Sequence, residues 1–211
     1  MKAIIFLFVI TIFPLSAQTL QKKNLESQPS QKQNSIERLS HYVDSRDGQI
    51  YKCIKIGDQI WLAQNFNYEI EGSYCYNNNE NHESKTGRLY TWEAAQKACP
   101  EGWHLPSDKE WQKLEEHLGL SEKESQSIDY RGNSQKLKSK LNALGFNIKM
   151  IGCRTYHDGN FLGMNSFTFF WSSTSYKEKY AYKRAFDSKI EGIGRHSHNK
   201  KHANSVRYVK D

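Results

Sequence analysis

The sequence predicts an α+β domain with two to three helices in its middle and short antiparallel strands at both ends. Residues 91–145 contain segments whose apolar residues recur at helical spacing, with capping residues before them. Residues 50–62 and 167–211 instead hold short runs of β-branched and aromatic residues, divided by polar turns. Elements of this kind bury their apolar faces against one another, so we expect the terminal strands to lie close together.

A hairpin opens the folded part of the chain. Apolar and polar residues alternate along residues 50–56, and Gly57-Asp58 then gives a tight turn into a second strand that carries Trp61. Near the other end, residues 167–174, 180–187 and 204–211 are rich in β-branched and aromatic residues and are predicted to be strands.

The first and third predicted helices are marked by their ends. Thr91 can cap a helix that begins with Trp92, contains three alanines and stops before Pro100. Further on, Leu137 and Leu141 share one helical face, and Gly145 follows as a stop signal.

The second helix, predicted from about Asp108 to Leu118, begins inside the densest stretch of the chain, CPEGWHLPSDKEW, residues 99–111. A catalytic interpretation makes His104 a base with Asp108 or Glu110 as its partner. The structural interpretation explains more residues, because Ser107 and Glu110 form an S-x-x-E capping box that starts a helix. We therefore assign this stretch to the scaffold. The residues expected to be structural are Trp61, Trp92, Trp103, Ser107, Glu110, Trp111 and Trp171.

The N-terminal residues predict export. Ala3 to Phe13 is an apolar run too short to span a bilayer, and small residues that suit cleavage after Ala17 follow it. Residues 1–17 are therefore expected to be a signal peptide, 18–45 a polar flexible tether and 46–211 the folded domain. No transmembrane segment is expected in the mature chain.

Charge and compartment together indicate the kind of partner. The formal net charge is +7, which favours an anionic cell-surface polysaccharide or an envelope protein. Nucleic acid is not expected for an exported chain. The final location, periplasmic, cell-surface or secreted, stays open, and excess lysine that only keeps the protein soluble stays an alternative to any charged ligand.

Four cysteines in an exported chain predict disulfide bonds. Cys75 and Cys99 flank an Asn-rich loop and the first helix, and Cys53–Cys153 is a compatible second bridge. Four cysteines allow three pairings, so the connectivity stays open.

Several segments resemble one family. DGQIYKCIKIGDQIWLAQNF, CYNNNENHESKTGRLYTWEAAQKACPEGWHLPSDKEW, FFWSSTS and SVRYVKD resemble, in this order, the Fibrobacter succinogenes major paralogous domain family, from about Asp44 to Asp211. That family is similar to the C-type lectin-like fold and, more distantly, to the formylglycine-generating enzyme group. The resemblance implies an exported bacterial surface or periplasmic domain without an assigned reaction. Tyr208 stands where the family usually has cysteine, so Cys99 lacks the partner that the family would give it.

The predicted binding surface lies between Cys153 and Ser205, because loops on a rigid scaffold usually carry recognition. Rings there can stack on a ligand while cations meet its anionic groups. The alternative is that Phe161 and Tyr180 belong to the core. The candidate ligand-binding residues are Tyr156, His157, Asp158, Asn160, Tyr176, Lys177, Lys179, Arg195, His196 and His198.

Metal and enzyme hypotheses have weaker support. His196, His198 and His202 could bind zinc or copper, but the cations beside them would repel a metal. Calcium stays possible only through scattered acids, without a dense D-x-D-x-D pattern; these are Glu80, Glu83, Asp158 and Asp187. No cofactor or catalytic residue is expected.

The sequence thus predicts a non-catalytic binding or surface-interaction module of the bacterial envelope. One alternative is an exported enzyme related to the formylglycine-generating group, although no G-x-S-x-G, H-E-x-x-H or P-loop motif is present. The other is a structural component of an envelope assembly.

Overall fold

The computed structural model describes residues 41–81 and 86–211, which form an α+β domain with mainly antiparallel strands. The predicted signal peptide and most of the predicted tether lie outside the described residues. The last part of that tether does not: His41–Val43 forms a strand, β1, that pairs with β2. The described domain therefore includes residues before position 46.

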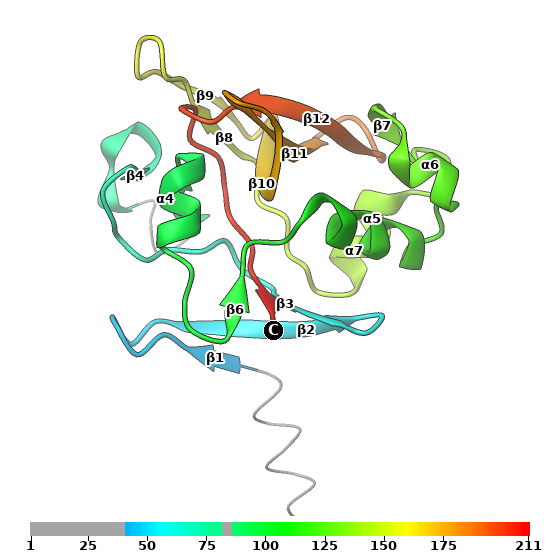
Figure 1. The fold of residues 1–211 in the computed structure, drawn as a ribbon, viewed down its shortest axis with the longest axis horizontal. Helices are drawn as coiled ribbons and strands as arrows, with labels where there is room; N and C mark the ends of the chain where they lie inside the picture. The colour runs from blue at the N-terminus through cyan, green and yellow to red at the C-terminus, as the bar shows by residue number, and fades with distance from the viewer. Residues whose placement is uncertain (1–40, 82–85) are drawn as a thin grey trace, which may run out of the picture. The chain divides into compact units, whose positions relative to one another are not determined.

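A five-stranded sheet joins the two ends of the domain (Figure 1). Its strands, in spatial order, are β1 (His41–Val43), β2 (Ile50–Ile56), β3 (Gln59–Leu62), β13 (Val209–Lys210) and β6 (Trp103–His104). The predicted hairpin is β2–β3, and Gly57 in its turn has a φ of 62°, which glycine adopts without strain. Val209 of β13 pairs with Trp61 of β3. The terminal strands therefore meet, as predicted.

A six-stranded sheet contains most of the C-terminal half. Its order is β7 (Asp129–Arg131), β12 (Ile193–Asn199), β11 (Tyr180–Asp187), β10 (Phe167–Lys177), β8 (Ile151–Arg154) and β9 (Phe161–Met164). All its pairs are antiparallel except β8–β10. A small pair, β4 (Ser73–Tyr74) and β5 (Leu89–Tyr90), and a 3-10 turn, η1 (Tyr76–Asn78), precede the helices.

Four α-helices follow in the described chain: α4 (Trp92–Lys97), α5 (Asp108–His117), α6 (Glu122–Gln126) and α7 (Leu137–Ala143). Thr91 caps α4 by accepting a hydrogen bond from the Ala94 N–H. Ser107 and Glu110 form the predicted capping box of α5. Ser121 and Glu124 form a second capping box that starts α6, a short helix that the sequence analysis missed.

The core lies between the two sheets. Figure 1 shows α5 and α7 with β2–β3 on one side and β10–β12 on the other. One apolar cluster contains Trp61 from the first sheet, Trp111 and Leu141 from the helices and Phe170 from the second sheet, all fully buried. The final segment, red in Figure 1, runs from the second sheet to the first. Packing through this cluster thus joins all the main layers.

A buried charge network, made of Asp108, Glu115, Arg131, Arg184 and Arg195, lies between α5 and the second sheet. Glu115 accepts hydrogen bonds from Arg184, at 2.5 Å, and from Arg131. Asp108 accepts from Arg184 and Arg195, each at 2.7 Å. Buried charges of both signs that satisfy one another fix α5 on the sheet.

The predicted disulfides are not formed, since all four cysteines are free in the structure. Cys99 lies instead 2.9 Å from the carbonyl oxygen of Trp103, and Cys75 contacts Arg88. Cys53 lies in β2 and Cys153 in β8, which belong to different sheets. Tyr208, in the place of the family's usual cysteine, is buried in the cluster against which Cys99 packs, and its hydroxyl donates to the Ala95 carbonyl. An aromatic ring and a hydrogen bond thus join α4 to the C-terminal segment.

Candidate functional site

The residues of CPEGWHLPSDKEW are held in structural contacts. Trp103 and Trp111 are buried. One Glu110 carboxylate oxygen accepts from Ser107, and the other lies 2.6 Å from His104 Nε2. His104 Nδ1 lies 2.6 Å from a carboxylate oxygen of Asp211. Both imidazole nitrogens are therefore occupied by carboxylates, which places His104 in a link between β6, α5 and the C-terminal segment.

This link is expected to depend on pH. Burial alone would lower the pKa of His104, but the hydrogen bonds to Glu110 and Asp211 outweigh it and raise the pKa above 6.5. Because the pKa of His104 is higher in the folded state than in the unfolded state, the protonated histidine stabilises the fold. This stabilisation is complete at a pH below the unfolded-state pKa and is lost as the pH rises through the folded-state pKa. We expect His104→Gln to lower the melting temperature more at pH 6 than at pH 9. An equal decrease at both pH values would show that the histidine charge contributes nothing.

The candidate site is a groove of about 320 Å³ at one end of the second sheet, where four separate segments meet. The residues that line it are Glu93, Tyr156, Glu178, Lys179, Asn199, Lys200 and Lys201. They come from the first turn of α4, the loop after β8, the β10–β11 turn and the end of β12 with the turn after it. Ligand sites commonly have this concave form.

Backbone hydrogen bonds fix the segments of the groove to one another. Lys200 N–H donates to the carbonyl oxygen of Lys179, and Trp92 N–H donates to that of Lys200. Lys200 Nζ lies 4.1 Å from the centroid of the Trp92 ring, and the Trp92 indole N–H donates to the Ser172 carbonyl oxygen. Main-chain hydrogen bonds thus hold one wall of the groove in place, and the Lys200 ammonium lies beside the Trp92 ring.

Stacked imidazoles support the tyrosine of the groove. The Tyr156 ring lies 4.8 Å from the His202 ring, which stacks on His198 at 3.9 Å with an interplanar angle of 9°. Burial lowers the pKa of His198 to about 2 and also lowers that of His202, so both imidazoles are neutral at pH 7. Neutral rings can stack closely without charge repulsion, and the stack holds Tyr156 at the groove.

The structure brings together only part of the predicted binding residues. Tyr156 and Lys179 line the groove, and His157 packs beside Tyr156, with their ring centroids 3.7 Å apart. Tyr176 and Lys177 lie at the end of β10, just before the turn that carries Lys179, and do not line the groove.

Two predicted ligand residues instead shape their own loop. The Asp158 carboxylate accepts hydrogen bonds from the backbone and the side chain of Asn160 and from the Thr155 hydroxyl. These contacts fix the turn that presents Tyr156. Of the alternative core residues, Phe161 is half-buried and packs against Tyr76, whereas Tyr180 is exposed.

Arg195, His196 and His198 were expected on a recognition loop, but the segment from Arg195 to Asn199 is part of β12. Arg195 is buried against Asp108 in the charge network and cannot also meet a ligand in the groove. His196 and His198 pair in register with Lys183 and Ala181 of β11. His198 lies behind the groove through its stack on His202, whereas His196 lies beside Tyr130 of β7.

The metal hypotheses gain no support from this arrangement. In the part of the chain that the structure describes, no group of three or more His, Cys, Asp or Glu residues is placed to hold a metal ion. Of the acids considered for calcium, Asp158 is engaged in its own loop, and Glu83 lies outside the described residues.

Five residues that line the groove are not among the ligand-binding candidates predicted from the sequence: Glu93, Glu178, Asn199, Lys200 and Lys201. Glu93 lies on the exposed face of a helix predicted for other reasons, and nothing local distinguishes it. Glu178 follows directly after Lys177, at the turn between β10 and β11. The position of this turn in the sequence could have indicated that Glu178 lies beside Lys179 at a possible binding site.

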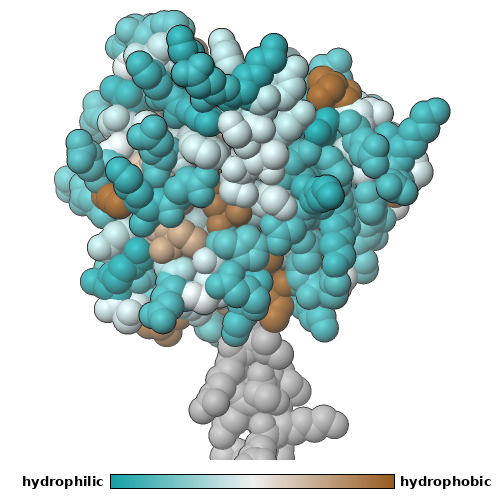
Figure 2. All heavy atoms as spheres, in the orientation of Figure 1, coloured by the Kyte–Doolittle hydropathy of each residue, from teal (hydrophilic) through white to brown (hydrophobic). Residues whose placement is uncertain are grey.

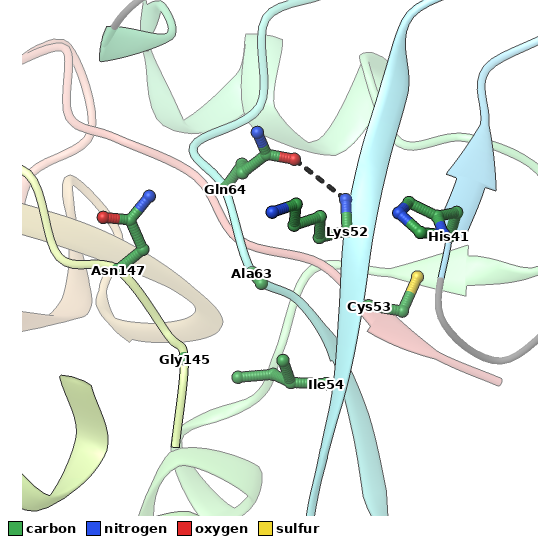
Figure 3. A pocket seen from close by; sticks show the side chains of 8 residues that line it. All are labelled: His41, Lys52, Cys53, Ile54, Ala63, Gln64, Gly145 and Asn147. Carbon is green, nitrogen blue, oxygen red and sulfur yellow. Dashed lines mark hydrogen bonds between the residues drawn. The ribbon is translucent and has the colours of Figure 1, made fainter. Parts of the chain in front are cut away.

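A second hollow, of about 580 Å³, lies beside the first sheet (Figure 3). Its side chains include Lys52, Cys53, Gln64 and Asn147, and the Gln64 side-chain oxygen accepts a hydrogen bond from the Lys52 backbone N–H. Burial raises the pKa of Cys53 to about 11, so its thiol is protonated at pH 7. The lining offers one lysine and no aromatic ring apart from the imidazole of His41, and the groove fits the predicted kind of ligand better.

Polar groups dominate the visible surface. Figure 2 shows a mostly hydrophilic face on which apolar residues form small, separate areas. Contact at this face would therefore depend mainly on polar and charged groups.

None of the helices in residues 41–81 and 86–211 is long and apolar enough to cross a membrane.

Comparison with known proteins identifies a family. The model of the Fibrobacter succinogenes major domain matches residues 54–210, which is most of the described chain. Neither curated proteins nor solved structures give a match.

Proposed function

The chain belongs to the Fibrobacter succinogenes major domain family, and for this member we propose that it is an exported, non-catalytic module that binds an anionic glycan of the cell envelope. The family match does not assign a biochemical activity. The observation that supports the proposal is the groove, which gathers Tyr156 and three lysines from segments far apart in the sequence.

The chemistry of the groove suits an acidic sugar. The ring of Tyr156 offers an apolar face against which a sugar ring can pack, and Lys179, Lys200 and Lys201 offer donors for carboxylate or sulfate groups. Glu93 and Glu178 can accept hydrogen bonds from sugar hydroxyls. The groove therefore provides for both the charged and the neutral groups of such a ligand.

Two further parts of the proposal rest on the sequence. The apolar run before Ala17 supports export. A C-type lectin-like architecture is supported by the resemblance of the motifs and agrees with the pairing of β13 with the β2–β3 hairpin. In such an architecture, loops after the helices are carried by a rigid sheet and are free to recognise ligands.

The groove is tested by binding to polygalacturonate, with neutral dextran as the comparison polymer. We expect Tyr156→Ala and Lys200→Gln each to weaken binding roughly tenfold, or about 1.4 kcal/mol, as for a central contact residue. Binding should also weaken at high salt, because exposed charges are screened.

Lys189→Gln is the matched control. It removes one exposed lysine at the opposite end of β11 and should leave binding unchanged. Circular dichroism and melting temperature establish that each variant is folded. The groove assignment is wrong if folded groove variants bind polygalacturonate as well as the control does.

A further inference from the structure

Lys183 is a buried lysine without a charged partner. Its residue is 6% exposed, and it pairs in register with Trp171 on one side and His196 on the other. Nζ lies 3.1 Å from the centroid of the Phe169 ring. Among the described residues, its ammonium group has no hydrogen-bond acceptor and no carboxylate. The Phe169 ring offers this ammonium a cation–π contact, but burial without a hydrogen-bond acceptor or a counter-charge still favours the neutral amine.

The groups around Lys183 strengthen this preference. Burial lowers the pKa of Lys183 to about 7, and only Cys153 acts in the opposite direction. The imidazoles of His196, His198 and His202 are all held neutral mainly by burial, and the charge of Lys183 lowers the pKa of each of them further. A cationic Lys183 would therefore be poorly compensated, whereas the free amine fits.

Lys138 gives an internal comparison. It is buried to nearly the same extent, at 8% exposure, but Nζ donates to the carbonyl oxygens of Asp187 and Ser188 and lies 3.5 Å from Glu191. The Lys138 side chain thus has two hydrogen-bond acceptors and a nearby carboxylate. Lys138 and Lys183 are therefore buried to a similar extent but differ in whether the amino group has hydrogen-bond acceptors. A difference in their reactivity would reflect the missing acceptors and not burial alone.

We propose that Lys183 is a reactive amine that condenses with small aldehydes. Nζ attacks the carbonyl carbon, the two nitrogen-bound protons leave with the carbonyl oxygen as water, and a C=N bond remains. Loss of water is favoured where little water is present, as beside the rings of Phe169 and Trp171. Apolar surroundings also favour a small, uncharged aldehyde over a charged one. This reactivity uses residues that do not line the groove, so it stands or falls independently of glycan binding.

Reductive labelling with propanal and cyanoborohydride, followed by peptide mapping, tests the proposal on the folded protein. At pH 7 we expect Lys183 to be modified about tenfold or more faster than Lys138 and Lys189, because a pKa lowered to about 7 leaves a large share of Lys183 as the reactive free amine. The labelling rate of Lys183 should level off above about pH 8, where its amine is almost wholly deprotonated.

Three results would overturn the proposal. Lys183 could remain unmodified while Lys189 reacts, it could react only when urea is added, or its labelling rate could still rise steeply above pH 8. Lys183→Arg should remove the fast-labelled peptide. Since the wild-type protein contains both comparison lysines, the test does not depend on the stability of that variant.

Discussion

Replacing Glu115 by glutamine is expected to lower the free energy of unfolding by about 3–5 kcal/mol, the range found when one partner of a buried ion pair is removed. Glu115 is fully buried, and its carboxylate accepts hydrogen bonds from Arg131 and Arg184. Glutamine has nearly the same shape but no charge, and its amide NH₂ would face guanidinium donors. Urea unfolding followed by tryptophan fluorescence measures the change as a lower midpoint with an unchanged slope.

Lys113→Gln is the control on the same helix. Lys113 forms an ion pair with Asp58 at 2.5 Å, but both side chains are more than half exposed, at 56% and 69%. Exposed pairs contribute about 0–1 kcal/mol, so this variant should unfold almost as the wild type does. If Glu115→Gln were as mild as Lys113→Gln, the charge network would not be what fixes α5 on the second sheet.

The parts of the fold that the sequence could predict are encoded within a few neighbouring residues. The capping box of Ser107 and Glu110, the cap at Thr91 and the turn at Gly57 each need only four or fewer positions to be complete. The capping box of Ser121 and Glu124 has the same form, so the start of α6 is also encoded locally, although the helix was not among those predicted.

The basic run after Ile193 could not be assigned correctly from local features. Arg195 looks like an exposed loop residue because its partner, Asp108, lies 87 positions away in the chain. Once that partner is known, the strand period is evident: Arg195 faces the charge network, and His196 lies beside Lys183. Charged residues at buried strand positions conceal the alternation on which strand prediction depends.

The groove shows the same division between local and distant information. From the sequence, ligand-binding residues were predicted on loops after Cys153. Two of them, Tyr156 and Lys179, line the groove. It could not indicate that Glu93, from the first turn of α4, lies at the same groove, because that depends on the backbone contact between Trp92 and Lys200. To predict a site built from four segments, one must know the register of the sheet that brings those segments together.

Trp111→Ala is the second change with a large expected effect. The side chain is fully buried, and its ring lies 4.7 Å from that of Trp61, 6.0 Å from Phe146 and 6.1 Å from Phe170. Removing a buried tryptophan typically costs about 3–5 kcal/mol, because apolar contact is lost and a cavity remains. Trp111→Phe keeps an aromatic ring in the cluster and should cost less.

The position of Trp111 predicts where the effect will be felt. Trp61 belongs to the first sheet and Phe170 to the second, so one side chain contacts both layers. If the two sheets are stabilised through this cluster, hydrogen exchange should become faster in β2–β3 and in β10–β11 together in the alanine variant. Faster exchange in β2–β3 alone would show that the second sheet is stable without the cluster. The charge network between α5 and β11 would then be sufficient to hold that half of the domain.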